Sequence, residues 1–206
     1  MSSQLLNCLI VITICSTLVV CDKYVNKFND IYGCKQTNAV NGYTHAIEFI
    51  PTENFQNTGH GQNSTLFRIG ILGPSYAVIR FSKIAMPYNK DTVHEIAFGT
   101  SYNQYTEVRR QIRNNAKHYK NQVLATISTP KILSELEPFV ITVEFLPGGS
   151  VQLTRLNETV PFLVFSDPKA EISYNYIGFS SHLVKVIFFF DCPMMNFHLW
   201  TDTLKL

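Results

Sequence analysis

The sequence has 206 residues, of which 46% are hydrophobic, 16% are charged and 13% are aromatic. This apolar content is enough for one domain with a substantial core, and it excludes a disordered chain. The net charge of +2 gives no reason to expect a nucleic acid or an acidic molecule as a partner.

The first 21 residues have the features of a secretory signal peptide. They contain no charged side chain, and residues 9–20 form an apolar run that is too short for a transmembrane helix. Val19 and Cys21 are tolerated before a cleavage site, so we predict that residues 1–21 are removed after Cys21. The mature protein is then expected to be secreted, extracellular and without a transmembrane segment; an uncleaved anchor is the alternative.

Removal of the signal peptide would leave two of the five cysteines, Cys34 and Cys192. In an oxidising compartment, an even pair near opposite ends of a domain is most simply a disulfide. Such a bridge would close a loop of more than 150 residues. In the chain-entropy model that is worth roughly 5 kcal/mol. The alternative is two unrelated buried thiols.

The mature chain begins with a polar stretch, and we assign residues 22–42 to an N-terminal segment. In residues 43–49, Tyr43, His45, Ile47 and Phe49 alternate with more polar positions, which predicts a half-buried strand. Residues 51–62 form a loop rich in Asn, Thr and Gly, and the loop ends in Asn63-Ser64-Thr65, an N-glycosylation acceptor.

Short strand candidates continue along the chain. Residues 66–72 and 76–82 are separated by the breaker Gly73-Pro74-Ser75, and we expect them to form a hairpin. Later candidates are 92–98, 104–112, 122–128, 139–146, 151–156, 160–165, 173–179, 183–190 and 197–204. Their regular spacing, without a convincing helical period, predicts an all-β fold, an antiparallel β-sandwich of jelly-roll type.

The clearest of these signals lies in residues 139–179. Alternation in 139–146, a turn at 147–150, alternation in 151–156 and a second turn at 157–159 predict a β-meander. The second turn contains Asn157-Glu158-Thr159, another glycosylation acceptor. Residues 184–190 are continuously apolar apart from one lysine, which indicates a strand covered on both sides.

Local motifs for catalysis are missing. The one G-x-G, Gly59-His60-Gly61, lacks the strand before it and the helix after it that a dinucleotide site requires. His94-Glu95 begins the H-E-x-x-H zinc motif, but Phe98 replaces the second histidine. We therefore predict no catalytic, cofactor-binding or metal-binding residues and no cofactor. A catalytic triad assembled from residues distant in the sequence stays open.

One charge cluster occurs, with five basic residues between positions 107 and 120. On a strand and the following loop it would bind a polyanion such as a sulfated glycan. The alternative is a solvated strand edge that its charges protect from pairing with another molecule. The five residues are Arg109, Arg110, Arg113, Lys117 and Lys120.

Several stretches resemble, in order, the farnesoic acid O-methyltransferase-like domain of arthropods. They are residues 94–99, 108–110, 139–143, 161–168 and 174–179, and the resemblance covers about residues 43–192. We take 43–192 as the domain and 193–206 as a C-terminal strand. The family name implies methylation of farnesoic acid with S-adenosylmethionine, on the route to juvenile hormones.

We predict a secreted, glycosylated, non-catalytic module of an arthropod that binds a carbohydrate, an apolar molecule or a matrix partner. Sandwich loops suit recognition, and Tyr102, Tyr105 and Tyr119 are candidates for stacking on sugar rings. One alternative is an enzyme of terpenoid metabolism, and another is a structural component of cuticle or an extracellular barrier. Four residues of the most specific stretch are assigned to strand core and turn: Phe162, Phe165, Asp167 and Pro168.

Overall fold

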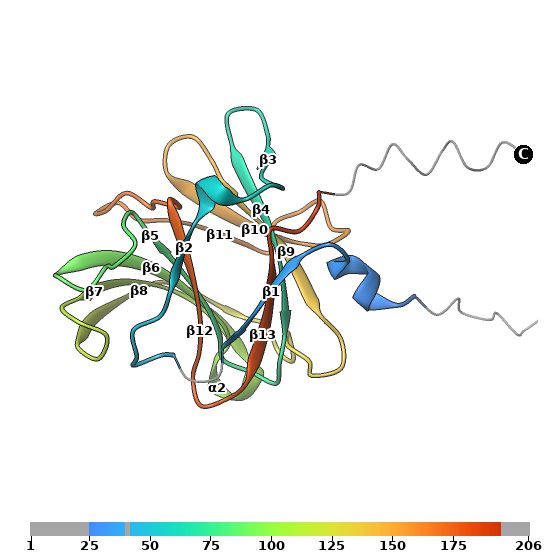
Figure 1. Cartoon of the computed structure of the whole chain (residues 1–206), viewed down its shortest axis with the longest axis horizontal. Helices are drawn as coiled ribbons and strands as arrows, with labels where there is room; N and C mark the ends of the chain where they lie inside the picture. Colours follow the sequence, from blue (N-terminus) through green and yellow to red (C-terminus); the bar gives the residue numbers. More distant parts are fainter. Residues whose placement is uncertain (1–24, 40–41, 195–206) are drawn as a thin grey trace, which may run out of the picture.

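Two antiparallel sheets pack face to face in this protein (Figure 1). The computed structural model describes residues 25–39 and 42–194. The seven-stranded sheet has the order β1 (Lys35–Ala39), β13 (Val186–Phe190), β4 (Thr65–Leu72), β9 (Phe139–Phe145), β10 (Ser150–Arg155) and β11 (Leu163–Ser166), with β3 (Gly59–His60) paired to β4. The six-stranded sheet has the order β2 (Phe49–Pro51), β12 (Tyr176–Ser181), β5 (Ala77–Ser82), β6 (Asp91–Gly99), β7 (Tyr105–Arg113) and β8 (Tyr119–Ser128).

The core lies between the sheets and is rich in aromatic side chains. Phe81 of the six-stranded sheet meets Phe145 of the seven-stranded sheet, with ring centroids 5.1 Å apart. Phe179 and Phe188 make a similar contact at 4.9 Å. The predicted all-β antiparallel sandwich is confirmed, and its jelly-roll type stays a prediction. Helical structure is limited to short turns among the described residues, namely η1 (Lys27–Ile31), η2 (Thr52–Asn54) and α2 (Thr100–Asn103).

The meander is confirmed. Strands β9, β10 and β11 are consecutive neighbours, and Val151 pairs with Phe145 on one side and with Phe165 on the other. Gly148 and Gly149 adopt φ of 86° and 83° in the β9–β10 turn, a conformation that side-chain-bearing residues rarely adopt. The turn predicted from local sequence therefore fixes the register of the meander.

The predicted hairpin of residues 66–72 and 76–82 is wrong. Strand β4 lies between β13 and β9, whereas β5 lies between β12 and β6 in the other sheet. Both strands are buried along most of their length, because each is central in its own sheet. The breaker between them, which includes Gly73, therefore carries the chain from one sheet to the other.

The predicted strand at residues 43–49 is also wrong. Only Phe49 belongs to a strand, β2, and residues 42–48 instead cross the outer face of the six-stranded sheet. The apolar residue Ile47 in this alternating pattern packs onto that outer face instead of belonging to a strand. A Cβ at Gly178 would lie 2.8 Å from Ile47 Cδ1, so glycine makes room for it.

The N-terminal segment is part of the sandwich. Strand β1 pairs with β13, so the two ends of the described chain lie side by side (Figure 1). Cys34 and Cys192 form the predicted disulfide, with Cα atoms 4.1 Å apart. The outer side of β13 is covered as predicted, since Phe189 and Ile31 both lie against Gly70. The predicted signal peptide and the predicted strand 197–204 lie outside the described residues.

Candidate functional site

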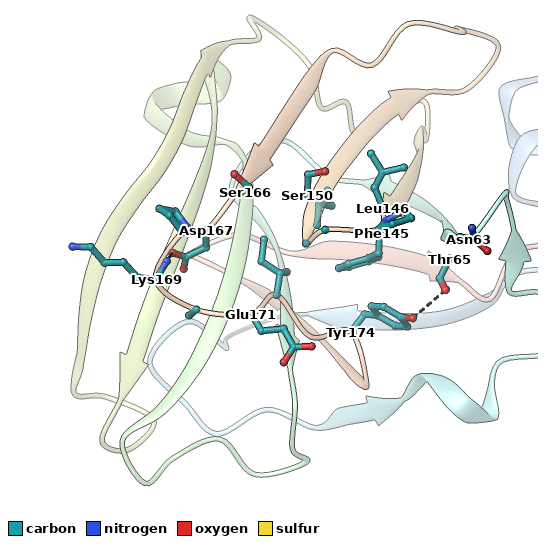
Figure 2. A pocket seen from close by; sticks show the side chains of 17 residues that line it. Asn63, Thr65, Phe145, Leu146, Ser150, Ser166, Asp167, Lys169, Glu171 and Tyr174 are labelled. Atoms are coloured by element: carbon teal, nitrogen blue, oxygen red, sulfur yellow. Dashed lines mark hydrogen bonds between the residues drawn. The ribbon is translucent and has the colours of Figure 1, made fainter.

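An open pocket of about 790 Å³ lies where the β9–β10 turn meets the connection from β11 to β12, residues 167–175 (Figure 2). Ligand pockets commonly have this size. About half of its lining residues carry polar side chains: Asn63, Thr65, Ser150, Ser166, Asp167, Lys169, Glu171 and Tyr174. Hydroxyl, amide, carboxylate and ammonium groups thus surround one hollow.

Tyr174 gives the pocket an aromatic surface. Its ring lies 4.6 Å from that of Phe145, centroid to centroid, and its hydroxyl is hydrogen-bonded to Thr65 Oγ1 at 3.0 Å (Figure 2). A second pocket of about 580 Å³ shares Thr65 and Tyr174 with the first. Tyr174 therefore stands between two adjoining hollows, an arrangement that fits an elongated ligand.

One wall of the pocket is pinned by Asp167, whose side chain is fully buried. The carboxylate accepts hydrogen bonds from Arg110 Nη1 at 2.7 Å and from the Lys169 amide at 2.9 Å, and it lies 2.9 Å from His94 Nε2. Arg110 and His94 project inward from β7 and β6. The 167–175 connection is thus tied to the six-stranded sheet.

The two acid–base groups of this contact have shifted pKa values. Burial would raise the pKa of Asp167, but hydrogen bonds from His94 and Lys169 and the charge of Arg110 lower it. Burial lowers the pKa of His94 although the Asp167 carboxylate opposes this effect. A neutral imidazole that donates its Nε2–H to an ionised Asp167 fits both directions.

Acidification is expected to destabilise the fold through His94. Its folded-state pKa lies below the unfolded value of 6.5, so the unfolded chain takes up the proton first. The contribution of neutral His94 to stability is complete above the unfolded-state pKa of 6.5. It is lost as the pH falls from there through the lower, folded-state pKa. Urea unfolding at about pH 7.5 and about pH 5 measures the loss. His94→Gln, which retains a donor without titrating, is expected to lose less stability over this interval; equal losses would contradict the assignment.

The hydrogen-bond partners of the His94 ring bear on the catalytic triad that the sequence leaves open. Between residues 42 and 194, no serine or threonine hydroxyl is hydrogen-bonded to the His94 ring. A serine nucleophile needs such a bond to its base. Metal chemistry has no obvious site either, because no group of three or more His, Cys, Asp or Glu in the described chain is placed to hold an ion.

The Gly59-His60-Gly61 stretch does not form a cradle for a nucleotide cofactor. The Gly61 amide donates to Ser64 O at 3.1 Å, and a Cβ at Gly61 would collide with Ser64 Oγ. At Gly59 a Cβ would lie 2.9 Å from Met194 Cε. The space beside both glycines is therefore filled by side chains of the protein itself. In addition, the strand pairs of the described residues are all antiparallel, whereas a dinucleotide-binding fold uses parallel strands.

The five basic residues of the predicted polyanion patch do not lie together. Arg109 and Arg113 are buried on the outer face of the six-stranded sheet, and Arg110 points to the opposite face, toward Asp167. Only Lys117 and Lys120 are exposed.

The other predicted surface residues also lie apart. Tyr102 and Tyr105 are exposed near the start of β7, whereas Tyr119 lies at the far end of the β7–β8 pair. Asn63 and Asn157 are both exposed at turns, with φ of 67° and 65°. Asn63 is at the pocket, and Asn157 is not among the residues that line it. Glycosylation at both positions stays a prediction.

Sequence reasoning missed the pocket residues. Phe165 is buried in the core as expected, but Asp167, assigned to a turn, holds the pocket wall. Asp167, His94, Arg110 and Tyr174 each lie in one of the stretches that carry the family resemblance. That shared location was the available signal, although no local spacing connects the four residues.

Comparisons with known proteins agree with the resemblance. The family model described as farnesoic acid O-methyl transferase matches residues 43–194. A search of curated proteins finds no match. No helix among the described residues is long and apolar enough to cross a membrane.

Solved structures give weak similarities. A crystal structure of HCR/D with a tryptophan-to-alanine substitution is 13% identical to this chain, with a TM-score of 0.35. The match covers 80% of this chain and 44% of the HCR/D chain. The binding domain of botulinum neurotoxin DC in complex with SialylT is 8% identical, with a TM-score of 0.33, and the match covers 80% of this chain and 44% of the toxin chain. An alginate lyase from Alteromonas sp. 272 is 11% identical, with a TM-score of 0.22, and the match covers 75% of this chain and 91% of the lyase chain. The chain spans less than half the length of the first two, and at these scores the likeness says nothing about ligands.

Proposed function

The chain belongs to the farnesoic acid O-methyltransferase family, and we propose that this member is a secreted, non-catalytic module that binds a carbohydrate in the pocket beside Tyr174. The observation that carries the proposal is the lining of that pocket. A tyrosine ring lies among hydroxyl, carboxylate and ammonium groups. Sugars present both apolar ring faces and hydroxyl groups, so they match such a surface.

The family name implies S-adenosylmethionine, and the residues present do not fit it. The two glycines of the G-x-G face Ser64 and Met194 rather than open space. A methyltransferase acting on a terpenoid acid also needs an apolar channel for a 15-carbon chain beside the cofactor. About half of the residues that line the pocket beside Tyr174 carry polar side chains, so this pocket is not such a channel. Binding without catalysis is therefore the function that we propose.

Secretion is supported by two independent features. The Cys34–Cys192 disulfide is typical of oxidising compartments. The apolar run at residues 9–20 has the length of a signal peptide. A glycan on Asn157 would leave the pocket free, since Asn157 does not line it, whereas a glycan on Asn63 would lie at the pocket.

Replacing Tyr174 by Ala tests the site. The change removes the stacking surface and the hydroxyl, so we expect binding of the tightest ligand on a glycan array to weaken about 10- to 30-fold. Isothermal titration calorimetry measures the effect. The matched control is Tyr102→Ala, because Tyr102 is 96% exposed and lies away from the pocket. Equal losses in both variants, or no loss in Tyr174→Ala, would contradict the assignment.

A further inference from the structure

The outer face of the six-stranded sheet carries a buried polar group of residues, here called the outer-face cluster. Arg80 on β5, Glu95 on β6 and Arg109 on β7 lie side by side in the strand register. Gln111 and Arg113 follow on the same face of β7, because side chains alternate along a strand. All five side chains are buried, although this face points away from the core.

Residues 42–48 cover this cluster. Two glycines permit the close approach: a Cβ at Gly42 would lie 2.8 Å from a serine hydroxyl on β12, and one at Gly178 would lie 2.8 Å from Ile47. The single backbone–backbone hydrogen bond within the described part of this segment, from His45 N to Gly42 O, is internal. The segment therefore lies on the sheet without belonging to it.

Tyr43 is the residue of this segment that reaches the cluster. Its carbonyl accepts hydrogen bonds from Arg80 Nη2 at 3.1 Å and Arg113 Nη2 at 3.3 Å. Its phenol oxygen accepts one from Arg109 Nη1 at 2.9 Å and donates to Glu95 Oε1 at 3.1 Å. Burial raises the pKa of Tyr43, so the phenol is neutral and supplies no negative charge.

The cluster contains more positive charge than its own residues neutralise. Glu95 pairs with Arg80 and Arg109, and Glu107 pairs with Arg109 alone. Arg113 is fully buried and has no carboxylate partner among the described residues. In that same part of the chain, Arg80 Nη1 and Arg113 Nε find no hydrogen-bond acceptor. Buried donors of this kind are costly, and an oxygen anion would satisfy them.

We propose that the outer-face cluster is a second binding site, for the carboxylate of an acidic sugar, and that Tyr43 occupies this site until the ligand displaces it. A guanidinium matches the two oxygens of a carboxylate, so Arg80 and Arg113 are the residues that bind it. Tyr88 and Tyr119 lie beside Arg113, with ring centroids 5.9 and 4.8 Å from its guanidinium carbon, and they supply aromatic surface to the sugar ring. The site is separate from the Tyr174 pocket and does not depend on the function proposed for it.

Replacing Tyr43 by Ala in the whole chain tests this site. The variant no longer holds residues 42–48 on the sheet through the phenol, so a larger fraction of molecules is open to ligand. We expect trigalacturonate to bind about tenfold more tightly than to the wild type in calorimetry at low ionic strength. Neutral galactotriose is expected to gain nothing. Arg113→Gln, added to Tyr43→Ala, is expected to abolish the gain because it removes the unpaired charge.

Thermal unfolding and near-ultraviolet circular dichroism show whether each variant is folded. If Tyr43→Ala does not fold, Tyr43→Phe keeps the ring and loses only the hydroxyl, and a gain of about threefold is expected. Equal affinity of the wild type and the folded variant for trigalacturonate would overturn the proposal. So would an equal gain for galactotriose, or a gain that survives Arg113→Gln. An equal gain for inorganic sulfate would overturn the assignment to a sugar.

Discussion

Replacement of Glu95 by Gln is expected to lower the free energy of unfolding by about 3–5 kcal/mol. Glu95 is fully buried, and its two oxygens receive Arg80 Nε at 2.9 Å and Arg109 Nη1 at 3.1 Å. Removing the charge leaves Arg80 buried without a carboxylate partner and leaves Arg109 with Glu107 alone, and Arg80 in turn lies close enough to Arg113 to lower its pKa. Desolvated cations without a counter-ion account for the large loss. Urea unfolding of the oxidised protein measures it.

The matched control is Glu107→Gln. Glu107 also pairs with Arg109, at 2.6 Å, but its side chain is 20% exposed and Arg109 retains Glu95. We expect a loss of about 1 kcal/mol. Similar losses in the two variants would show that burial of the outer-face cluster does not determine how much unfolding free energy is lost.

Replacement of Asp167 by Asn is expected to affect stability and binding together. It removes the buried charge shared by Arg110 and His94, and we expect a loss of about 3 kcal/mol, because Arg110 is 11% exposed and can turn to water. The connection at residues 167–175 then loses its ionic link to β6 and β7, so the pocket wall beside Tyr174 loosens. Glycan affinity is expected to fall about tenfold or more.

Urea unfolding and calorimetry on the same preparation separate the two effects of Asp167→Asn. Asp91→Asn is the control, since Asp91 receives a hydrogen bond from the exposed amide of Asn89 and does not line the pocket. We expect Asp91→Asn to leave glycan affinity unchanged. Unchanged affinity in a folded Asp167→Asn protein would contradict the role given to Asp167.

Local patterns predicted the strands more reliably than their partners. Alternation in residues 139–145 and the Gly148-Gly149 turn determine β9 and β10, because neighbouring strands of a meander are also neighbours in sequence. The relation between β4 and β5 is not local, since each pairs with strands from distant parts of the chain. A breaker such as Gly73-Pro74-Ser75 marks the end of a strand without showing which sheet comes next.

Burial of charged side chains could not be predicted for a similar reason. The period of two places Arg109 and Arg113 on one face of β7, but only the structure shows that residues 42–48 cover that face. Likewise, 73 positions separate His94 from Asp167. Their contact depends on the packing of two sheets, for which single-residue spacing carries no information.

Parallel glycan and lipid arrays with purified wild-type protein and the Tyr174→Ala variant test the central claim most directly. The pocket beside Tyr174 predicts that the wild type is retained by a set of glycans, and that Tyr174→Ala loses this retention while remaining folded. Retention by lipids alone, or glycan retention that is unchanged in Tyr174→Ala, would contradict a carbohydrate-binding pocket at this position.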